Sequence, residues 1–571
     1  MTVPDADGGE AVLQACTDLG ADYIFSSAGS EWAPVWEALA RREAAGEAAP
    51  RYLDLAHETI AVGMATGYAA VTGRVQAVLL HAGAGLLQGA NAVQGALLTG
   101  VPVVVCSGES TGYGDGAGRD PGSQWYRNLS IVGGPQAFAA PFTKSASAAA
   151  DAGVLYDMVK RAGELAAQPP AGPVYVNTPV EVLLSRWQRP PAARPAPPAP
   201  RTVAADEDVE VAARLLAAAQ RPVLAVESAG HDGDAYAALV ELADLLAIGV
   251  VEPQSAVCAN FPRTHPLHQG GDLAALAADA DLVVLLGCRA PWYPPGAKPG
   301  AAKVLVIDEV PHRPYMAYQV LSADHYVGGD TAATLRAIVA RLRGLDHSID
   351  TGVVAARRDR LAAAHAAADA ARQDAETRAL GRAEASVDPV AVAATLRDLL
   401  NGDAAVVDET ITHSRTIARH LMASVPGRYR YVQGGLGQGL GLTLGAKLAL
   451  GPRMTVFTVG DGSRLYNPVL PGLMASAEHG LPVLVVIFNN GSYASMKNNH
   501  LRSYPEGAAA RSGHFRGVDL SAQPDPAAVA SAAGAAGITV RATEQLAPAL
   551  DKAITAVRSG QTAVVNVLLT R

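Results

Sequence analysis

Short, uninterrupted apolar runs rich in valine, leucine and isoleucine recur along this chain, and stretches with helical spacing separate them. The clearest runs lie at residues 101–109, 221–230, 280–288, 302–310 and 481–490. Strands that are apolar on both faces belong to parallel sheets whose two faces are covered by helices. We therefore expect an α/β fold of doubly wound parallel sheets, with ligands beyond the carboxyl ends of the strands.

Two segments interrupt this alternation. Residues 186–202 are dense in proline, which is typical of an extended, semi-rigid spacer. Residues 356–385 are rich in alanine, arginine and acidic residues, and this composition predicts an exposed helix that joins two domains. The length of 571 residues is too great for one hydrophobic core. We expect three doubly wound domains, at residues 1–187, 203–345 and 386–571.

The composition indicates a globular protein and excludes several functional classes. Apolar residues make up 49% of the chain, charged residues 17%, and the net charge is −9. We expect neither a nucleic-acid nor a membrane partner, because the chain has no basic stripe and no apolar run long enough to cross a bilayer. The first residues lack the features of a secretory signal, and the four cysteines lie far apart. We therefore expect a cytoplasmic protein with free thiols.

A carboxylate between two glycines ends the apolar run at residues 455–460. Asp461 is followed by a helical stretch and by a second apolar run, after which Asn490 stands. Parallel strands of a βαβ unit end at the same edge of the sheet, so these two side chains should lie close together. A carboxylate and an amide oxygen suit Mg²⁺, while Gly462 and Ser463 can offer N–H groups and a hydroxyl to a phosphate. Either fragment alone would be an ordinary turn, but their spacing favours a site.

Together the two fragments resemble the signature of the thiamine diphosphate (ThDP)-dependent enzymes, a GDG followed one strand later by NN. The resemblance implies that Asp461, Asn490 and the carbonyl group of Ser492 bind Mg²⁺, which bridges to the diphosphate of the cofactor. It also implies further cofactor contacts in this segment from Gly462, Ser463, Ser492 and Tyr493.

Two earlier stretches resemble other cofactor contacts of this family. The glycine-rich stretch at residues 433–450 implies that Leu436, beside Gly434 and Gly435, is the bulky residue beneath the thiazolium ring. The alternative is a helix start whose small residues serve packing. Thr412 and His413 stand where the family makes further contacts to the diphosphate.

ThDP chemistry also needs a carboxyl group that hydrogen-bonds to the aminopyrimidine ring and promotes formation of the C2 ylid. A strand-like run meets a helical stretch at Glu58, and Gly73 is expected to end that helix. Taken alone, Glu58 is an ordinary carboxylate favoured by the helix dipole. The stretch resembles the catalytic-glutamate segment of the family, however, and this implies that Glu58 is the catalytic carboxyl group.

Two more polar residues near this segment, His81 and Ser30, resemble those of benzoylformate decarboxylase. His81 stands at the end of an apolar run, and the resemblance implies that it faces the reacting carbonyl group and moves protons. The alternative is a hydrogen-bonded loop histidine. Ser30 matches a serine that contacts the substrate carboxylate, although serine is also a favoured helix N-cap. Gln88 is a candidate for a second polar contact.

One departure concerns the middle segment. Benzoylformate decarboxylase supplies a second histidine from there, whereas this chain has Trp292 and Tyr293 near the expected place. A phenylglyoxylate substrate is therefore in doubt. His500, in a stretch that could form a lid over the site, is a possible substitute. The segment also lacks the glycine spacing of a dinucleotide-binding loop, so we do not expect FAD.

The resemblance covers nearly the whole chain and implies a ThDP- and Mg²⁺-dependent 2-oxo acid decarboxylase or carboligase that works through an ylid and an enamine. An aldehyde or ketone would be the acceptor in the second case. One alternative is an acetolactate-synthase-like carboligase that uses pyruvate. Another is a non-catalytic binding subunit with the ThDP fold, which the presence of Glu58, Asp461 and Asn490 disfavours.

The resemblance further implies a homodimer or homotetramer with shared active sites. Glu58 of one subunit and Asp461 of another would then face the same cofactor.

Overall fold

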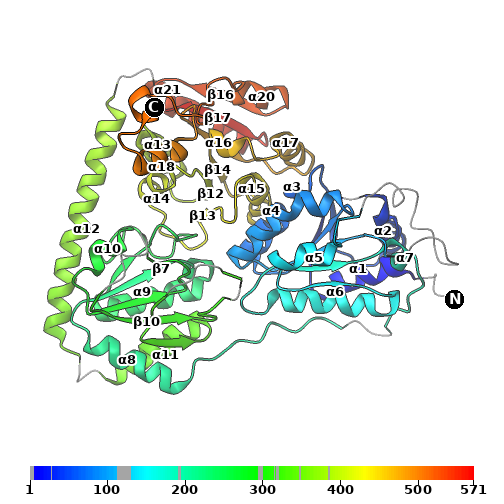
Figure 1. Cartoon of the computed structure of the whole chain (residues 1–571), viewed down its shortest axis with the longest axis horizontal. Coiled ribbons are helices and arrows are strands. Elements are labelled where there is room, and N and C mark those ends of the chain that lie inside the picture. The colour runs from blue at the N-terminus through cyan, green and yellow to red at the C-terminus, as the bar shows by residue number, and fades with distance from the viewer. Residues whose placement is uncertain are drawn as a thin grey trace.

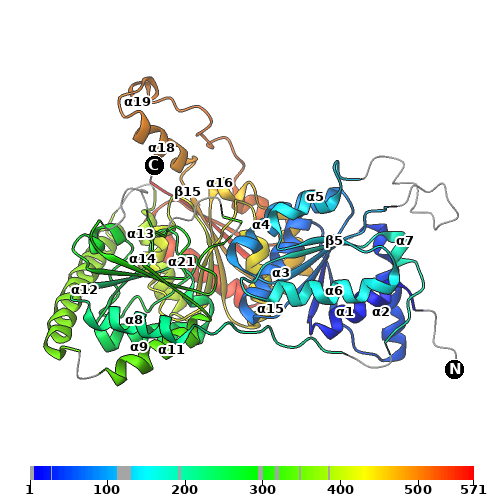
Figure 2. The same ribbon diagram turned by 60° about the horizontal axis from the view of Figure 1, so that its bottom comes forward.

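The structure is a computed structural model of the whole chain. It describes residues 6–27, 29–111, 130–190, 194–292, 300–313, 315–316, 321–345, 349–382 and 386–570. Three sheets follow one another along the chain, and helices lie on both faces of each (Figure 1, Figure 2). All strand pairs among the named strands are parallel. The expected α/β fold with three doubly wound domains is confirmed.

The N-terminal sheet has the strand order β2-β1-β3-β4-β6-β5. Its strands are β1 (Tyr23–Ser27), β2 (Arg51–Asp54), β3 (Gln76–Leu80), β4 (Val103–Ser107), β5 (Ala146–Ala148) and β6 (Val174–Asn177). The helices around it are α1 (Gly8–Asp18), η1 (Ser30–Trp32), α2 (Ala33–Ala45), α3 (Glu58–Thr72), α4 (Ala84–Thr99), α5 (Pro135–Ala139), η3 (Ala140–Phe142), α6 (Ala152–Ala167) and α7 (Val180–Leu183).

The central sheet has the strand order β11-β10-β9-β7-β8. Its strands are β7 (Pro222–Val226), β8 (Gly249–Val251), β9 (Leu282–Leu286), β10 (Lys303–Asp308) and β11 (His325–Gly328). Its helices are α8 (Asp206–Ala218), η4 (Ala229–His231), α9 (Gly233–Leu246), α10 (Leu273–Ala277) and α11 (Thr331–Gly344). The predicted joining helix is α12 (Thr351–Leu380), which runs along the outside of the molecule (Figure 1). The described parts of the proline-dense spacer, residues 186–190 and 194–202, contain neither helix nor strand.

The C-terminal sheet has the strand order β13-β12-β14-β15-β17-β16. Its strands are β12 (Ala405–Glu409), β13 (Tyr429–Tyr431), β14 (Thr455–Gly460), β15 (Leu484–Asn489), β16 (Ala536–Val540) and β17 (Ala563–Leu568). Its helices are α13 (Pro389–Leu400), α14 (Ser414–Leu421), α15 (Gly439–Leu450), α16 (Asp461–Arg464), α17 (Val469–Glu478), α18 (Ala494–Ser503), α19 (Ala508–Ser512), α20 (Pro526–Ala532) and α21 (Thr543–Arg558).

The N-terminal and C-terminal sheets share one topology. When the strands of each sheet are counted from its own first strand, both orders read 2-1-3-4-6-5. Helices α3 and α15 occupy equivalent places after the second strand, and they pack directly on each other. A Cβ atom on Gly67 would lie 2.1 Å from the carbonyl oxygen of Leu442, and one on Gly445 would lie 2.0 Å from that of Met64. Glycine therefore permits the close approach that joins the two domains into one hydrophobic core.

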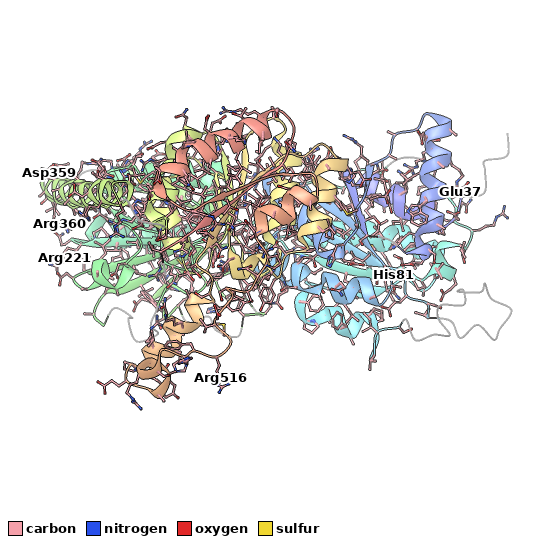
Figure 3. All side chains as sticks on the ribbon, turned by 90° about the horizontal axis from the view of Figure 1, so that it is seen from above. Glu37, His81, Arg221, Asp359, Arg360 and Arg516 are labelled. Atoms are coloured by element: carbon pink, nitrogen blue, oxygen red, sulfur yellow. The ribbon has the colours of Figure 1, made fainter. Side chains whose placement is uncertain are left out.

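Helices α18 and α19 project from the body of the molecule, with Arg516 near the end of the projection (Figure 2, Figure 3). Neither helix buries a residue. In the described parts of the chain, no helix combines the length and apolar character that crossing a bilayer requires.

Candidate active site

The carboxyl ends of β14 and β15 bring together the residues that the sequence singles out in the C-terminal domain. The two strands are neighbours, with Gly460 opposite Phe488, so the side chains that follow them meet at one edge. Asp461 is buried, with 2% of its surface exposed, and its carboxylate accepts a hydrogen bond from Nε2 of Gln523 at 3.3 Å. Burial still raises the pKa of Asp461. A cation at this edge would offset the cost of burying the charge.

Asn490 lies beside this carboxylate and fixes the turn after β15. Its Oδ1 accepts from the backbone N–H of Ser492 at 2.9 Å and from the Ser492 hydroxyl at 3.0 Å. Its Nδ2 is 3.4 Å from Nε2 of His413, the residue before α14. Burial lowers the pKa of His413 to about 4, so the ring is neutral at pH 7 and can accept this hydrogen bond. Thr412, by contrast, is exposed.

Gly462 also has a packing role that the sequence does not show. The sequence suggests that this glycine lets a diphosphate approach the backbone, but the aromatic ring of Tyr493 lies over it. A Cβ atom on Gly462 would be 2.5 Å from a ring carbon of Tyr493. Close packing between these two candidate residues therefore explains the glycine in this structure. Ser463 lies in the same short helix and is buried.

The glycine-rich loop before α15 is held from two sides. On one side, Asn91 of α4 donates to the carbonyl oxygen of Leu436 at 2.8 Å, and Gln94 donates to that of Gly434 at 3.3 Å. A Cβ atom on Gly435 would lie 2.6 Å from the side-chain oxygen of Asn91. The loop thus runs directly along α4, and side chains of α4 hold it through its backbone carbonyl groups.

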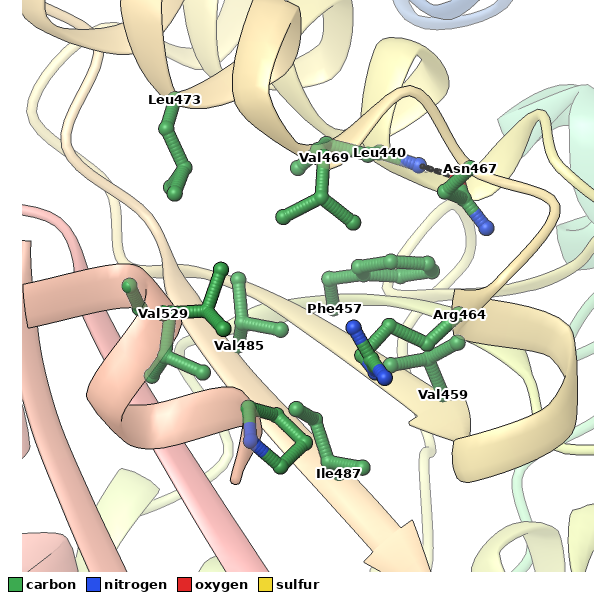
Figure 4. Close-up of a pocket in the computed structure, with 13 residues that line it drawn as sticks. Leu440, Phe457, Val459, Arg464, Asn467, Val469, Leu473, Val485, Ile487 and Val529 are labelled. Atoms are coloured by element: carbon green, nitrogen blue, oxygen red, sulfur yellow. Dashed lines mark hydrogen bonds between the residues drawn. The ribbon is translucent and has the colours of Figure 1, made fainter. Parts of the chain in front are cut away.

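On the other side the loop is held by Glu409, a buried residue that the sequence analysis missed. Its carboxylate accepts the backbone N–H groups of Gly437 at 2.5 Å and Gln438 at 3.2 Å. It also accepts from Nδ2 of Asn467 at 2.6 Å, and Asn467 in turn accepts from the N–H of Leu440 (Figure 4). Burial raises the pKa of Glu409 to about 7. An acidic residue at a strand end is the only sequence signal that could have suggested this role.

The N-terminal domain places Glu58 and His81 on either side of the start of α4. Glu58 is the first residue of α3, and Gly73 ends that helix in the left-handed conformation, as the sequence predicts. A Cβ atom on Gly85 would lie 3.4 Å from Oε1 of Glu58 and 3.0 Å from Cβ of His81. Because Gly85 has no side chain, Glu58 and His81 can both pack against it and lie close together.

His81 is bound by a second carboxylate that the sequence analysis also missed. Its Nδ1–H donates to Glu31 at 2.9 Å and 3.1 Å from the two carboxylate oxygens, and the backbone N–H of Ala82 donates to the same group at 2.7 Å. Glu31 is 5% exposed. The hydrogen bond to Glu31 is the main cause of a raised pKa of His81, and the charge of Glu58 adds to it. The ring is therefore held in one orientation with its Nε2 edge directed away from Glu31.

Ser30 and Gln88 are less firmly placed by the structure. Ser30 is exposed and is the first residue of η1, while Gly29 is the N-cap residue. The N-cap alternative for Ser30 is therefore wrong. The side chain of Gln88 is exposed, and only its carbonyl group is used, as the acceptor for the Thr59 hydroxyl at 3.0 Å.

The other expectations in this region concern the central domain and the proposed lid. Trp292 is 8% exposed, and its ring N–H finds no hydrogen-bond partner among the described residues. Tyr293 lies outside the described residues. His500 lies on the projection, where its ring contacts the rings of Tyr504 and Phe515.

The donor set decides which cation the C-terminal edge could hold. The described residues contain no group of three or more His, Cys, Asp and Glu side chains placed to bind a metal ion. A single carboxylate with amide and carbonyl oxygens is poor in ligands for zinc. It fits Mg²⁺, which takes few protein oxygens and completes its octahedron with phosphate and water.

Comparison with known proteins identifies the class to which this arrangement belongs. The model of the thiamine pyrophosphate enzyme N-terminal TPP binding domain matches residues 6–126, that of the central domain residues 209–338, and that of the C-terminal TPP binding domain residues 410–567. These matches cover more than half of the chain in the order of the three sheets. The chain belongs to the ThDP-dependent enzyme family.

The relatives within that family differ in activity. The chain is 27% identical to the acetolactate synthase large subunit IlvB1 of Mycobacterium tuberculosis, over 96% of this chain and 85% of that protein. It is 26% identical to a sulfoacetaldehyde acetyltransferase of Castellaniella defragrans, over 98% and 93%. It is 27% identical to a benzoylformate decarboxylase of Pseudomonas aeruginosa, over 78% and 80%.

A solved structure agrees with the fold. The Rhodococcus jostii RHA1 thiamine diphosphate-dependent 4-hydroxybenzoylformate decarboxylase superposes with a TM-score of 0.79 at 22% identity, over 99% of both chains. At this identity the likeness supports the fold and leaves the substrate open.

Proposed function

We propose that the protein is a ThDP- and Mg²⁺-dependent 2-oxo acid decarboxylase or carboligase. The observation that carries the proposal is the presence of two clusters of polar side chains: Glu58 and His81 on the N-terminal domain, and Asp461 and Asn490 on the C-terminal domain. A non-catalytic role would not require all four polar side chains in these positions.

The C-terminal edge would hold the diphosphate end of the cofactor. Asp461, Asn490 and the carbonyl group of Ser492 would bind Mg²⁺, and the loop at Gly434–Gly435–Leu436, fixed by Glu409 and α4, would lie under the thiazolium ring. Bound ThDP would supply a carbanion equivalent that attacks a 2-oxo carbon and accepts the electrons released as CO₂ leaves.

The N-terminal edge would move the protons. Glu58, at the start of α3, would hydrogen-bond to the pyrimidine ring of the cofactor. His81, whose protonated form the Glu31 carboxylate favours, would donate from Nε2 to the carbonyl oxygen of the substrate. Neutralising that oxygen as it gains charge stabilises the transition state.

Exposed apolar side chains support the proposal that two subunits meet at the active site. Leu465, Tyr466, Leu470 and Met474, in and beside α16 and α17, are 46–59% exposed although they are large and apolar. We propose that a second copy of the chain covers them, since exposed apolar clusters of this kind mark interfaces. A homodimer or homotetramer formed through this surface would place the second subunit beside α16, which begins at Asp461.

An acetolactate-synthase-like carboligase is the second candidate, and the match to IlvB1 over 96% of the chain favours it. The decarboxylase and the synthase differ in the donor and the acceptor that they use. Purified protein with ThDP and Mg²⁺ should be offered a panel of 2-oxo acids, each with and without an aldehyde acceptor, while CO₂ and products are measured. Strict dependence on pyruvate with a ligated product would favour the synthase reading. Free aldehyde from a larger 2-oxo acid would favour the decarboxylase.

A further inference from the structure

All three domains meet at a small cavity of about 40 Å³. Helices α3 and α4 form one wall, η4 of the central domain forms a second, and β13 with the start of α15 forms the third. Its polar lining includes His231, Arg430, Gln433 and Gln438. His231, Arg430 and Gln433 lie outside the candidate active site, while the backbone N–H of Gln438 is held by Glu409.

Arg430 is a cation without a counter-charge at this junction. Its Nη1 is 2.7 Å from Nδ1 of His231, and its Nη2 donates to the carbonyl oxygen of Ala70 at 2.6 Å. Its Nε–H is buried and has no hydrogen-bond partner in the described parts of the chain. Among those same residues, no carboxylate forms an ion pair with Arg430, and burial lowers its pKa. The guanidinium is partly exposed at its Nη atoms, but its Nε–H is buried without an acceptor, so an acceptor is missing at this point of the cavity.

The neighbours of Arg430 do not remove this excess of positive charge. Because Nη1 of Arg430 can only donate, Nδ1 of His231 must accept, which leaves that ring neutral. A second guanidinium, that of Arg289, lies close by, with Nη2 at 3.3 Å from Oε1 of Gln433. The nearest carboxylate to Arg289 is Glu227, at 3.5 Å. Glu227 therefore offsets Arg289 and leaves Arg430 uncompensated.

We propose that the cavity is a binding site for a small oxyanion, such as phosphate or a short carboxylate, held by the Nε–H of Arg430 and the glutamine amides. The volume sets the size of the ligand. One water needs about 10–15 Å³ measured in this way, so 40 Å³ admits an oxyanion of few atoms and excludes a nucleotide. Arginine suits this ligand because its donors match the spacing of carboxylate and phosphate oxygens.

The cavity lies next to the glycine-rich loop, so an anion bound there would affect that loop. Gln433 and Gln438 flank residues 434–437, the loop proposed to lie under the cofactor. Anion binding and ThDP binding would therefore influence each other reciprocally. This coupling rests on the proposed function, whereas anion binding itself does not.

The test uses the full chain without ThDP. Thermal unfolding and titration calorimetry would be followed with sodium phosphate, with sodium acetate and with sodium chloride at matched ionic strength. Wild type should show a saturable rise in Tm with an oxyanion beyond that with chloride. Arg430→Met should weaken the affinity by at least about tenfold, since a charge-assisted hydrogen bond is lost. Comparing the affinities for phosphate and for acetate shows which of the two oxyanions the cavity binds.

The control is Arg428→Met, which removes a guanidinium that donates to the carbonyl oxygen of Asp403 at 2.9 Å. It should leave anion affinity unchanged. Without anion, Arg430→Met should melt at or below the wild-type Tm, because the hydrogen bonds to His231 and Ala70 are lost. If it does not fold, Arg430→Lys keeps the charge, lacks Nε–H and should still bind anions more weakly than wild type.

Two results would overturn the proposal. One is a wild-type shift no larger with either oxyanion than with chloride. The other is equal oxyanion affinity in wild type and in the Arg430 variants. If the oxyanion binds but leaves the ThDP affinity unchanged, the coupling is wrong and the site stands. If ThDP fails to bind at all, the proposed function fails and the anion titration still decides the site.

Discussion

His81 shows how much of the candidate chemistry depends on single side chains far apart in the sequence. The Glu31 carboxylate holds its Nδ1–H at 2.9 Å, and Glu58 adds a second negative charge nearby. Both favour the charged ring, so the pKa of His81 is raised. A raised histidine pKa keeps the proton to higher pH, and the proton is lost only as pH rises through that higher value. His81 is therefore suited to act as an acid up to higher pH than an unperturbed histidine.

Replacing Glu31 tests this arrangement. Glu31→Gln removes the charge and keeps the shape, so the pKa of His81 should fall. The alkaline limb of the kcat/KM profile should then move to lower pH, and activity at the acidic side should change far less. Glu37→Gln, on the outer helix α2 (Figure 3), is the matched control. An unshifted alkaline limb in Glu31→Gln would show that His81 is not the acid.

Motif spacing located some residues from the sequence and could not reveal others. The positions of Asp461 and Asn490 at one sheet edge follow from strand alternation, which a sequence displays directly. Glu31 and Glu409 were missed because each acts on a partner 28 or more residues away, and nothing in the sequence gives that contact. The packing of the Tyr493 ring on Gly462 was missed because it is visible only in three dimensions.

At the scale of secondary structure, the contact between α3 and α15 determines how the two outer domains fit together. Glycines on both helices let the backbones approach, and the first residues of both helices lie beside candidate site residues. The same contact therefore sets the spacing of Glu58 and the glycine-rich loop within one chain.

Gly67→Ala should disturb this contact. Its new methyl group would lie 2.1 Å from the Leu442 carbonyl oxygen, so the helices must separate. Overpacking of this kind costs about 1–3 kcal/mol, and the free energy of unfolding should fall by that amount in denaturant titrations. Gly344→Ala, in the last turn of α11 with open space around it, is the control and should be neutral or slightly stabilising. Equal stabilities for the two variants would contradict the close-packing account.

The strands and the long joining helix were predictable because apolar runs and helix-forming composition are local properties. The projection of α18 and α19 was not, since its residues bury nothing and so leave no periodic signal. The shared topology of the outer sheets was hidden for a related reason, because only the order of strands repeats and the sequence does not.

On the scale of the whole molecule, the exposed apolar side chains of α17 link assembly to activity. Leu470 and Met474 lie one helical turn apart and are 58% and 50% exposed. If a second copy covers them, the double variant Leu470→Asp with Met474→Asp should be monomeric by light scattering and inactive. Val154→Asp, on an exposed position of α6, is the control. A wild type that is monomeric and fully active would contradict the shared-site proposal.

The central claim is that a carboxyl group at the start of α3 drives ThDP chemistry on a 2-oxo acid. Its most direct test is ThDP- and Mg²⁺-dependent CO₂ release, measured for wild type, Glu58→Gln and the Glu37→Gln control. We predict release by wild type and by the control, and a loss of at least about 100-fold in Glu58→Gln, the range for a lost general acid or base. Equal release by Glu58→Gln, or no release from any 2-oxo acid by wild type with ThDP bound, would contradict the account.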